Sequence, residues 1–149
     1  MAVISVLGEP LVLIAIGVIG YLWATLHHQT AIRKAFIYAG IAFGLCVLLK
    51  LVLHKARPHN LDIRTFGIRS YSFPSGHAFG TVIFYGLLSY LALRYLVQPW
   101  GVIIFLLIWP LVAGIGISRI YLKAHYPSDV AGGWLLGLFS LIVVVKLAF

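Results

Sequence analysis

Five apolar stretches of membrane-spanning length dominate the sequence. They are residues Pro10–Leu26, Ile32–Leu53, His77–Leu96, Gly101–Ser118 and Val130–Ala148. A helix needs roughly 20 mostly apolar residues to cross a bilayer, and lipid forces the backbone to satisfy its hydrogen bonds internally. With 62% hydrophobic and 9% charged residues in a chain of 149, the sequence predicts one domain over residues 1–149. Its fold class is all-α, a polytopic membrane helix bundle of about five transmembrane helices.

The few polar residues gather in three motifs. These are Lys50-x6-Arg57-Pro58, Pro74-Ser75-Gly76-His77 and Ser118-Arg119-x5-His125-x3-Asp129. The first motif follows the second span, the second precedes the third span, and the third joins the last two. Counting crossings places all three on one side of the membrane, with the chain ends on opposite sides. Ionisable residues kept in so apolar a chain point to function, so we expect one site at one membrane face.

The shortage of carboxylates limits the chemistry. Glu9, Asp62 and Asp129 are the only acidic residues, against a net charge of +8. A two-metal phosphatase needs several carboxylates to hold its ions, and the sequence also lacks an HExxH motif or a Cys/His cluster. We therefore predict no metal and no cofactor. Because the cations lie at span ends, anionic lipid headgroups or an anionic substrate are better partners than nucleic acid.

The cations and the start of the third span suit a phosphate. Arg57 and Arg119 offer planar, bidentate hydrogen bonding, and Lys50 offers a point charge. Lys50 and Arg57 are two helical turns apart and share a face if the helix continues to Pro58. Ser75 is expected to be the N-cap of the next helix, where its hydroxyl and the backbone N–H groups at Gly76 form an anion site. Gly76 also allows close backbone approach.

Two histidines supply the groups that a phosphoryl transfer needs. His125 and Asp129 are four residues apart, and a carboxylate on one ring nitrogen leaves the other nitrogen as a nucleophile. His77 begins the third span beside the phosphate donors, where it would protonate the departing oxygen and then activate water.

The three motifs resemble the signature of the type-2 phosphatidic acid phosphatases, a superfamily that also includes soluble acid phosphatases and vanadium haloperoxidases. Every signature position is filled, over a core of residues 45–149. The resemblance implies metal-independent hydrolysis through a phosphohistidine, with His125 as the nucleophile, Asp129 as its orienting partner and His77 as the acid and base. Lys50, Arg57, Ser75, Gly76 and Arg119 would bind the phosphate. Membrane members typically have six spans, and this sequence has five.

The expected function is an integral membrane phosphatase that hydrolyses a lipid phosphate or pyrophosphate monoester. Candidate substrates are undecaprenyl pyrophosphate, phosphatidic acid, phosphatidylglycerol phosphate and lipid A phosphates. A lipid phosphotransferase with the same phosphohistidine, and a non-catalytic lipid-binding or transport protein with a relict site, are the alternatives. Without a basic n-region or cleavage site near the start, the first span is expected to remain.

The side of the membrane that carries the site follows less directly from the charges. Counting cations puts the motifs in the cytoplasm, whereas the Arg33-Lys34 pair favours the opposite orientation. The resemblance implies a bacterial inner membrane with the site facing the periplasm or exterior. The sequence leaves the oligomeric state open.

Overall fold

The computed structural model describes residues 1–58, 64–65, 68–69 and 71–149, so Asp62 lies outside the described residues. The described elements are the helices α1 (Ala2–Val6), α2 (Pro10–Leu26), α3 (Thr30–Leu53), α4 (Gly76–Tyr95), α5 (Trp100–Tyr121) and α6 (Pro127–Ala148), and the two short strands β1 (Arg64–Thr65) and β2 (Ile68–Arg69). The two strands pair antiparallel.

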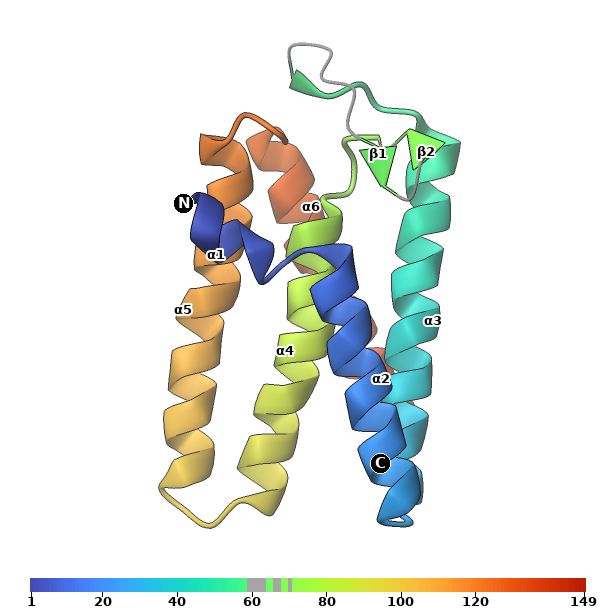
Figure 1. The fold of residues 1–149 in the computed structure, drawn as a ribbon, viewed down its shortest axis with the longest axis vertical. Helices are drawn as coiled ribbons and strands as arrows, with labels where there is room; N and C mark the ends of the chain where they lie inside the picture. The colour runs from blue at the N-terminus through green and yellow to red at the C-terminus, as the bar shows by residue number, and fades with distance from the viewer. Residues whose placement is uncertain (59–63, 66–67, 70) are drawn as a thin grey trace.

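The helical bundle matches the predicted spans. Helices α3, α4, α5 and α6 are long and apolar enough to cross a membrane, and α2 is a shorter apolar helix of 17 residues, at the lower end of the spanning range. The prediction of an all-α membrane bundle is confirmed. Helix α1, which the sequence did not predict, packs beside α5 at one end of the bundle (Figure 1).

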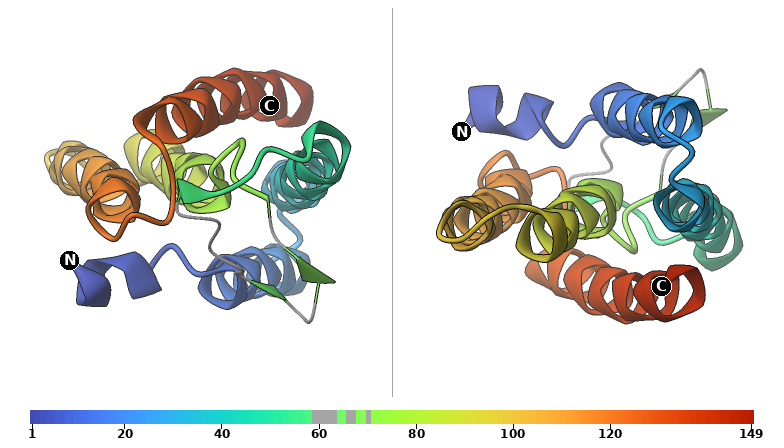
Figure 2. Two further views of the ribbon diagram at one scale, coloured as in Figure 1. Left: turned by 90° about the horizontal axis from the view of Figure 1, so that it is seen from above. Right: turned by 90° about the horizontal axis from the view of Figure 1, so that it is seen from below.

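Helix α4 lies at the centre of the bundle. It packs against α2, α3, α5 and α6, which surround it when the bundle is seen from either end (Figure 2). Two thirds of its most apolar window is buried, compared with 22–28% in the other three long helices. The first turn of α4 therefore starts inside the protein, and the residues there are screened from lipid.

Helix α6 approaches α4 closely because it carries a glycine at the crossing. A Cβ atom at Gly133 would lie 2.8 Å from the Ser75 carbonyl oxygen, closer than side-chain carbons come to backbone atoms. One turn earlier, the Ser75 N–H donates to the Asp129 carbonyl oxygen at 2.9 Å. This contact joins the second and third motifs directly.

All three motifs lie at the same end of the bundle. The last turn of α3, the first turns of α4 and α6 and the last turn of α5 meet at the top of Figure 1, whereas the α2–α3 and α4–α5 connections lie at the bottom. The N-terminus is near the top and the C-terminus near the bottom. The count of membrane crossings therefore predicted correctly that the three motifs lie on one side.

One local prediction was wrong. Helix α3 does not continue to Pro58 but ends at Leu53, where His54 takes the left-handed conformation with φ of 49°. Lys50 is thus helical, whereas Arg57 lies in the following loop. The loop, rather than a shared helix face, brings the Arg57 side chain to the site.

Candidate active site

The Asp129 carboxylate is the centre of a polar cluster. Asp129 is the third residue of α6 and is fully buried. Its Oδ1 atom accepts from Lys55 Nζ at 2.5 Å, and its Oδ2 atom accepts from the Tyr126 N–H at 3.0 Å and from the Ser72 hydroxyl. The Tyr126 bond is half of a capping box, which ties the carboxylate to the start of α6.

His125 lies in the short connection between α5 and α6 and contacts Asp129 through Ser72. His125 Nδ1 is 3.8 Å from Asp129 Oδ2, which is too long for a hydrogen bond, and 3.5 Å from Ser72 Oγ. The Ser72 hydroxyl donates to Asp129, so its oxygen is left to accept from the ring. The structure therefore places a serine between the histidine and the carboxylate that the sequence predicted to pair directly.

The other nitrogen of His125 faces Arg57. The Arg57 NH1 group is 3.2 Å from His125 Nε2 and 2.9 Å from the Ala124 carbonyl oxygen. A guanidinium can only donate, so Nε2 is the acceptor and the ring proton sits on Nδ1, facing Ser72. This tautomer presents the lone pair of Nε2 to the cationic side of the site.

The charge state of His125 follows from its surroundings. The His125 residue is only 3% exposed. Burial, followed by the positive charges of Arg57 and Lys50, lowers the pKa of His125 from 6.5 to about 2. The imidazole is therefore neutral at physiological pH and available as a nucleophile.

Three cations converge on the same region, of which Lys50 and Arg57 are buried and Arg119 is partly buried. Lys50 and Arg57 are each 7% exposed, and Lys50 donates to the Tyr71 carbonyl oxygen at 2.9 Å. Burial, followed by the charge of Arg119, lowers the pKa of Arg57 to about 10, so Arg57 remains charged at neutral pH. The Nε atom of Arg119 is buried without a hydrogen-bond partner in the part of the chain that the structure describes. An anion would satisfy such a group and would relieve the repulsion among the three cations.

The start of α4 lies beside these cations. Ser75 is the N-cap of α4 as predicted, and its buried hydroxyl accepts from the Ala78 N–H at 3.5 Å. A Cβ atom at Gly76 would meet only the end of Lys50, at 3.4 Å from Cε. The Gly76 backbone thus lies beside the end of the Lys50 side chain, where the helix N-terminus and the ammonium can act on the same anion.

His77 and Arg119 contact the N-terminal segment of the chain, which lies outside the three motifs. His77 Nε2 is 3.3 Å from Glu9 Oε1, and Arg119 NH1 donates to the Ser5 hydroxyl at 2.5 Å. Both partners belong to the N-terminal segment that lies across the ends of α4 and α5 (Figure 1). The structure therefore brings together all eight predicted site residues and adds Ser5, Glu9, Lys55 and Ser72.

Only Glu9 among these added residues carried a signal in the sequence. Three carboxylates in an otherwise apolar chain mark Glu9 as a functional candidate. Ser5 and Ser72 are ordinary serines outside any motif, and Lys55 is one of several cations near a span end. Their roles depend on loop paths that no local pattern predicts.

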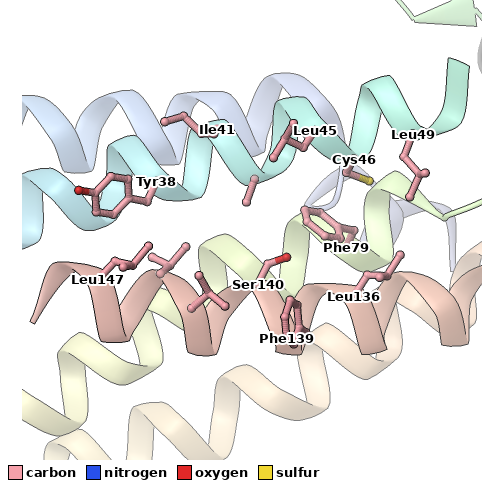
Figure 3. Close-up of a pocket in the computed structure, with 13 residues that line it drawn as sticks. Tyr38, Ile41, Leu45, Cys46, Leu49, Phe79, Leu136, Phe139, Ser140 and Leu147 are labelled. Atoms are coloured by element: carbon pink, nitrogen blue, oxygen red, sulfur yellow. The ribbon is translucent and has the colours of Figure 1, made fainter. Parts of the chain in front are cut away.

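An apolar groove runs between α3 and α6 toward the site. Its volume is about 350 Å³, and its walls are formed almost entirely by hydrocarbon side chains. Figure 3 shows Tyr38 and Leu147 toward one end, and Leu49, Leu136 and Phe79 toward the other. The second end is next to the site, because Leu49 precedes Lys50 and Phe79 lies two residues after His77.

Comparison with known proteins identifies the family. The family model described as the PAP2 superfamily matches residues 30–149, which include every motif residue. The chain belongs to the PAP2 superfamily. It is an integral membrane protein with the helical fold of that family.

Relatives of this PAP2 chain have names that denote different activities. Phosphatidylglycerophosphatase B of Bacillus subtilis is 32% identical over 50% of this chain and 38% of its own length. The bacitracin transport permease protein BcrC of Bacillus licheniformis is 30% identical over 88% of this chain and 63% of its own length. The lipid A 1-phosphatase of Rhizobium etli is 33% identical over 76% of this chain and 50% of its own length. The chain thus spans less than two thirds of each of these relatives.

The fold has a solved counterpart. The crystal structure of a transmembrane PAP2-type phosphatidylglycerolphosphate phosphatase from Bacillus subtilis superposes with a TM-score of 0.78. The alignment covers 98% of this chain and 73% of that chain, at 26% identity. The match therefore extends over the whole bundle, including the segment before residue 30.

The neutrality of His125 leads to a prediction about its titration. Between pH 8 and pH 5 the ring should keep one proton, on Nδ1, because burial and nearby cations disfavour the second proton. Nitrogen NMR of histidine-labelled protein, with the His125 signals assigned by their loss in His125→Gln, measures this directly. A His125 titration midpoint near 6.5 would contradict the buried, cation-facing geometry.

Proposed function

We propose that this protein is a membrane phosphatase that hydrolyses a lipid phosphate or pyrophosphate monoester through a phosphohistidine on His125, without a metal ion. The observation that carries the proposal is the orientation of His125. Its Nδ1 is backed by Ser72 and Asp129, and its Nε2 meets Arg57 at 3.2 Å. A neutral imidazole with one nitrogen fixed and the other directed at cations is an activated nucleophile beside an anion site.

The first half of the reaction forms the phosphohistidine. His125 Nε2 attacks phosphorus and the bond from phosphorus to the lipid oxygen breaks, with its electron pair passing to that oxygen. The departing oxygen takes a proton from His77. The Nδ1 proton of His125 stays hydrogen-bonded to Ser72, whose own proton is directed at Asp129, and the carboxylate stabilises the charge that develops on the ring.

The second half returns the enzyme to its starting state. His77 takes a proton from a water molecule, the water oxygen attacks phosphorus, and the phosphorus–nitrogen bond breaks to leave His125 neutral. Lys50, Arg57 and Arg119, together with the N-terminus of α4, hold the phosphoryl oxygens throughout. Fixed donors of this kind stabilise the charge on a transferred phosphoryl group. The reaction releases inorganic phosphate, or a lipid monophosphate from a diphosphate.

The source of the phosphate is inferred from the groove. From Tyr38 to Leu49 the groove follows α3 for eleven residues, or ~16 Å at 1.5 Å per residue, and one leaflet of hydrocarbon is about 15 Å deep. A lipid in that leaflet would lay a chain in the groove while its phosphate reached Lys50. Phosphatidic acid, phosphatidylglycerol phosphate, lipid A phosphate and undecaprenyl pyrophosphate all combine such a chain with such a headgroup. We place the site at the periplasmic or exterior face of a bacterial inner membrane.

The mechanism predicts that His125→Ala abolishes phosphate release. Purified protein in detergent is given a panel of these four lipid phosphates with EDTA present, and free phosphate is measured. The wild type should turn over at least one lipid, and the variant should lose at least ~10⁴-fold in kcat, because the nucleophile is gone. The unfolding temperature of the variant checks that the fold is kept.

Four results would contradict this proposal. Loss of wild-type activity in EDTA, with recovery on adding a divalent ion, would indicate a metal mechanism. Full activity of His125→Ala would exclude a phosphohistidine on His125 as the intermediate. Binding of the lipids without any phosphate release would favour a lipid-binding or transport protein. A supplied alcohol that captures most of the phosphate would instead identify a phosphotransferase with the same intermediate.

The groove predicts a dependence on chain length. Val143 lines the groove and Ile142, its neighbour on α6, does not and is 56% exposed. Val143→Trp should lower kcat/KM for a long-chain phosphatidic acid by about tenfold or more, because a displaced chain misplaces the phosphate. The matched control Ile142→Trp should leave that value unchanged, and neither variant should affect p-nitrophenyl phosphate. Equal effects of the two substitutions on the long-chain lipid would exclude the groove as the chain site.

A further inference from the structure

We propose that Glu9 is a positioning residue for His77, holding the ring so that its second nitrogen serves as the acid and base of the reaction. This inference rests on the proposed function, in which His77 protonates the departing oxygen. It adds a carboxylate outside the three motifs to the catalytic machinery.

The contact itself is specific. Glu9 Oε1 lies 3.3 Å from His77 Nε2, and the His77 side chain is 11% exposed while that of Glu9 is 49% exposed. Within the described residues, Glu9 is the one side chain to which the His77 ring bonds. Glu9 is also the N-cap of α2, and its backbone has an extended conformation, so the residue sits at a fixed point where the chain enters the bundle.

The segment that leads to Glu9 is anchored at three points. Upstream, the Ser5 hydroxyl is 3% exposed and accepts from Arg119 NH1, and the Leu7 carbonyl oxygen accepts from the Tyr85 hydroxyl at 3.0 Å. Gly8 then packs so tightly that a Cβ atom there would lie 2.6 Å from Ile115 Cγ2 and 2.9 Å from His77 Cδ2. These contacts fix the backbone that brings Glu9 beside His77.

The packing also defines which edge of the His77 ring is free. Cδ2 faces Gly8 and Nε2 faces Glu9, so the N-terminal segment covers the Cδ2–Nε2 edge. Nδ1 lies on the opposite edge of the imidazole. A carboxylate on Nε2 keeps a proton there and leaves Nδ1 as the nitrogen that gives and takes the catalytic proton.

The charges around His77 explain why a carboxylate is needed. The ring is mostly buried, and the positive charges of Arg119, Lys50 and Arg57 also act on it. A general acid must carry its proton before the reaction, and three cations oppose the positively charged imidazolium. The carboxylate of Glu9 opposes them, as an anion close to the ring favours its charged form.

The pairing uses every acidic residue that the structure describes. Of the three carboxylates in the chain, Glu9 and Asp129 lie in the described part, and each is directed at one of the two site histidines. Asp129 acts on Nδ1 of His125 through Ser72 and leaves Nε2 for phosphorus. Glu9 bonds to Nε2 of His77 and leaves Nδ1 for the leaving oxygen. The two histidines thus receive opposite tautomers, which suits their different tasks.

The test compares leaving groups. Dioctanoyl phosphatidic acid expels an alkoxide that needs a proton, whereas p-nitrophenyl phosphate expels a phenolate that does not. Glu9→Gln, which preserves the shape of the side chain but removes its charge, should lower kcat for the lipid about 10- to 100-fold, within the range of acid–base contributions. KM for the lipid, and the rate of the p-nitrophenol burst from the aryl phosphate, which reports the first step alone, should change by less than about twofold.

Two further variants separate the possible failures. His77→Ala should lose more on the lipid than Glu9→Gln does, while the p-nitrophenol burst from the aryl phosphate is retained; an unchanged kcat on the lipid would contradict the acid–base role of His77 in the proposed function. If His77→Ala shows the pattern but Glu9→Gln retains full activity on the lipid, the inference about Glu9 alone is wrong. Val6→Thr, at a 54% exposed position of the same segment, is the control and should leave both substrates unaffected.

Two other outcomes for Glu9→Gln would also overturn the inference. Equal losses on both substrates, with a lowered unfolding temperature, would assign Glu9 a structural role only. A rise in lipid turnover would mean that the N-terminal segment obstructs the site.

Discussion

The hydrogen bonds to the Asp129 carboxylate hold together the segments on which the site depends. Lys55 and Ser72 reach it from the two ends of the connection between α3 and α4, and the Tyr126 N–H reaches it from the start of α6. The backbone of the same residue accepts from Ser75 at the start of α4. A buried carboxylate demands such partners, because an unpaired charge away from water is very costly. The requirement to satisfy one anion therefore assembles three motifs that are distant in sequence.

The membrane explains why the polar residues are concentrated at one end. Hydrocarbon cannot hydrogen-bond to a charge, so cations and carboxylates are retained only where they meet one another, the protein backbone or a ligand. The site holds three cations, Lys50, Arg57 and Arg119. They outnumber the two carboxylates in the described part of the chain. This excess of positive charge at buried and partly buried positions is the physical reason to expect a phosphate. The central position of α4 keeps its first turn, and with it the anion site, away from bulk lipid.

The sequence predicted the fold and which residues meet at one end of the bundle, but not the contacts that join those residues. Bilayer thickness determines the length of a span, so the spans could be recognised from hydropathy. Counting them then predicted the bundle and the side of the membrane that the motifs share. Ser75 as an N-cap followed from local chemistry. The end of α3 at Leu53 did not, because the left-handed turn at His54 depends on how the next loop packs. Ser72 between His125 and Asp129, and Glu9 on His77, depend on contacts between segments more than 50 residues apart.

The central claim is that a covalent bond forms between phosphorus and His125, and trapping that bond tests it most directly. His77→Ala is mixed with radiolabelled p-nitrophenyl phosphate, which needs no acid for the first step, and is quenched in alkali. The account predicts that the protein retains label in a bond that survives alkali and breaks in acid. Peptide mapping should place the label on His125, and the label should be absent when His125→Gln is combined with His77→Ala. Release of p-nitrophenol without labelled protein, or label on any other residue, would contradict the account.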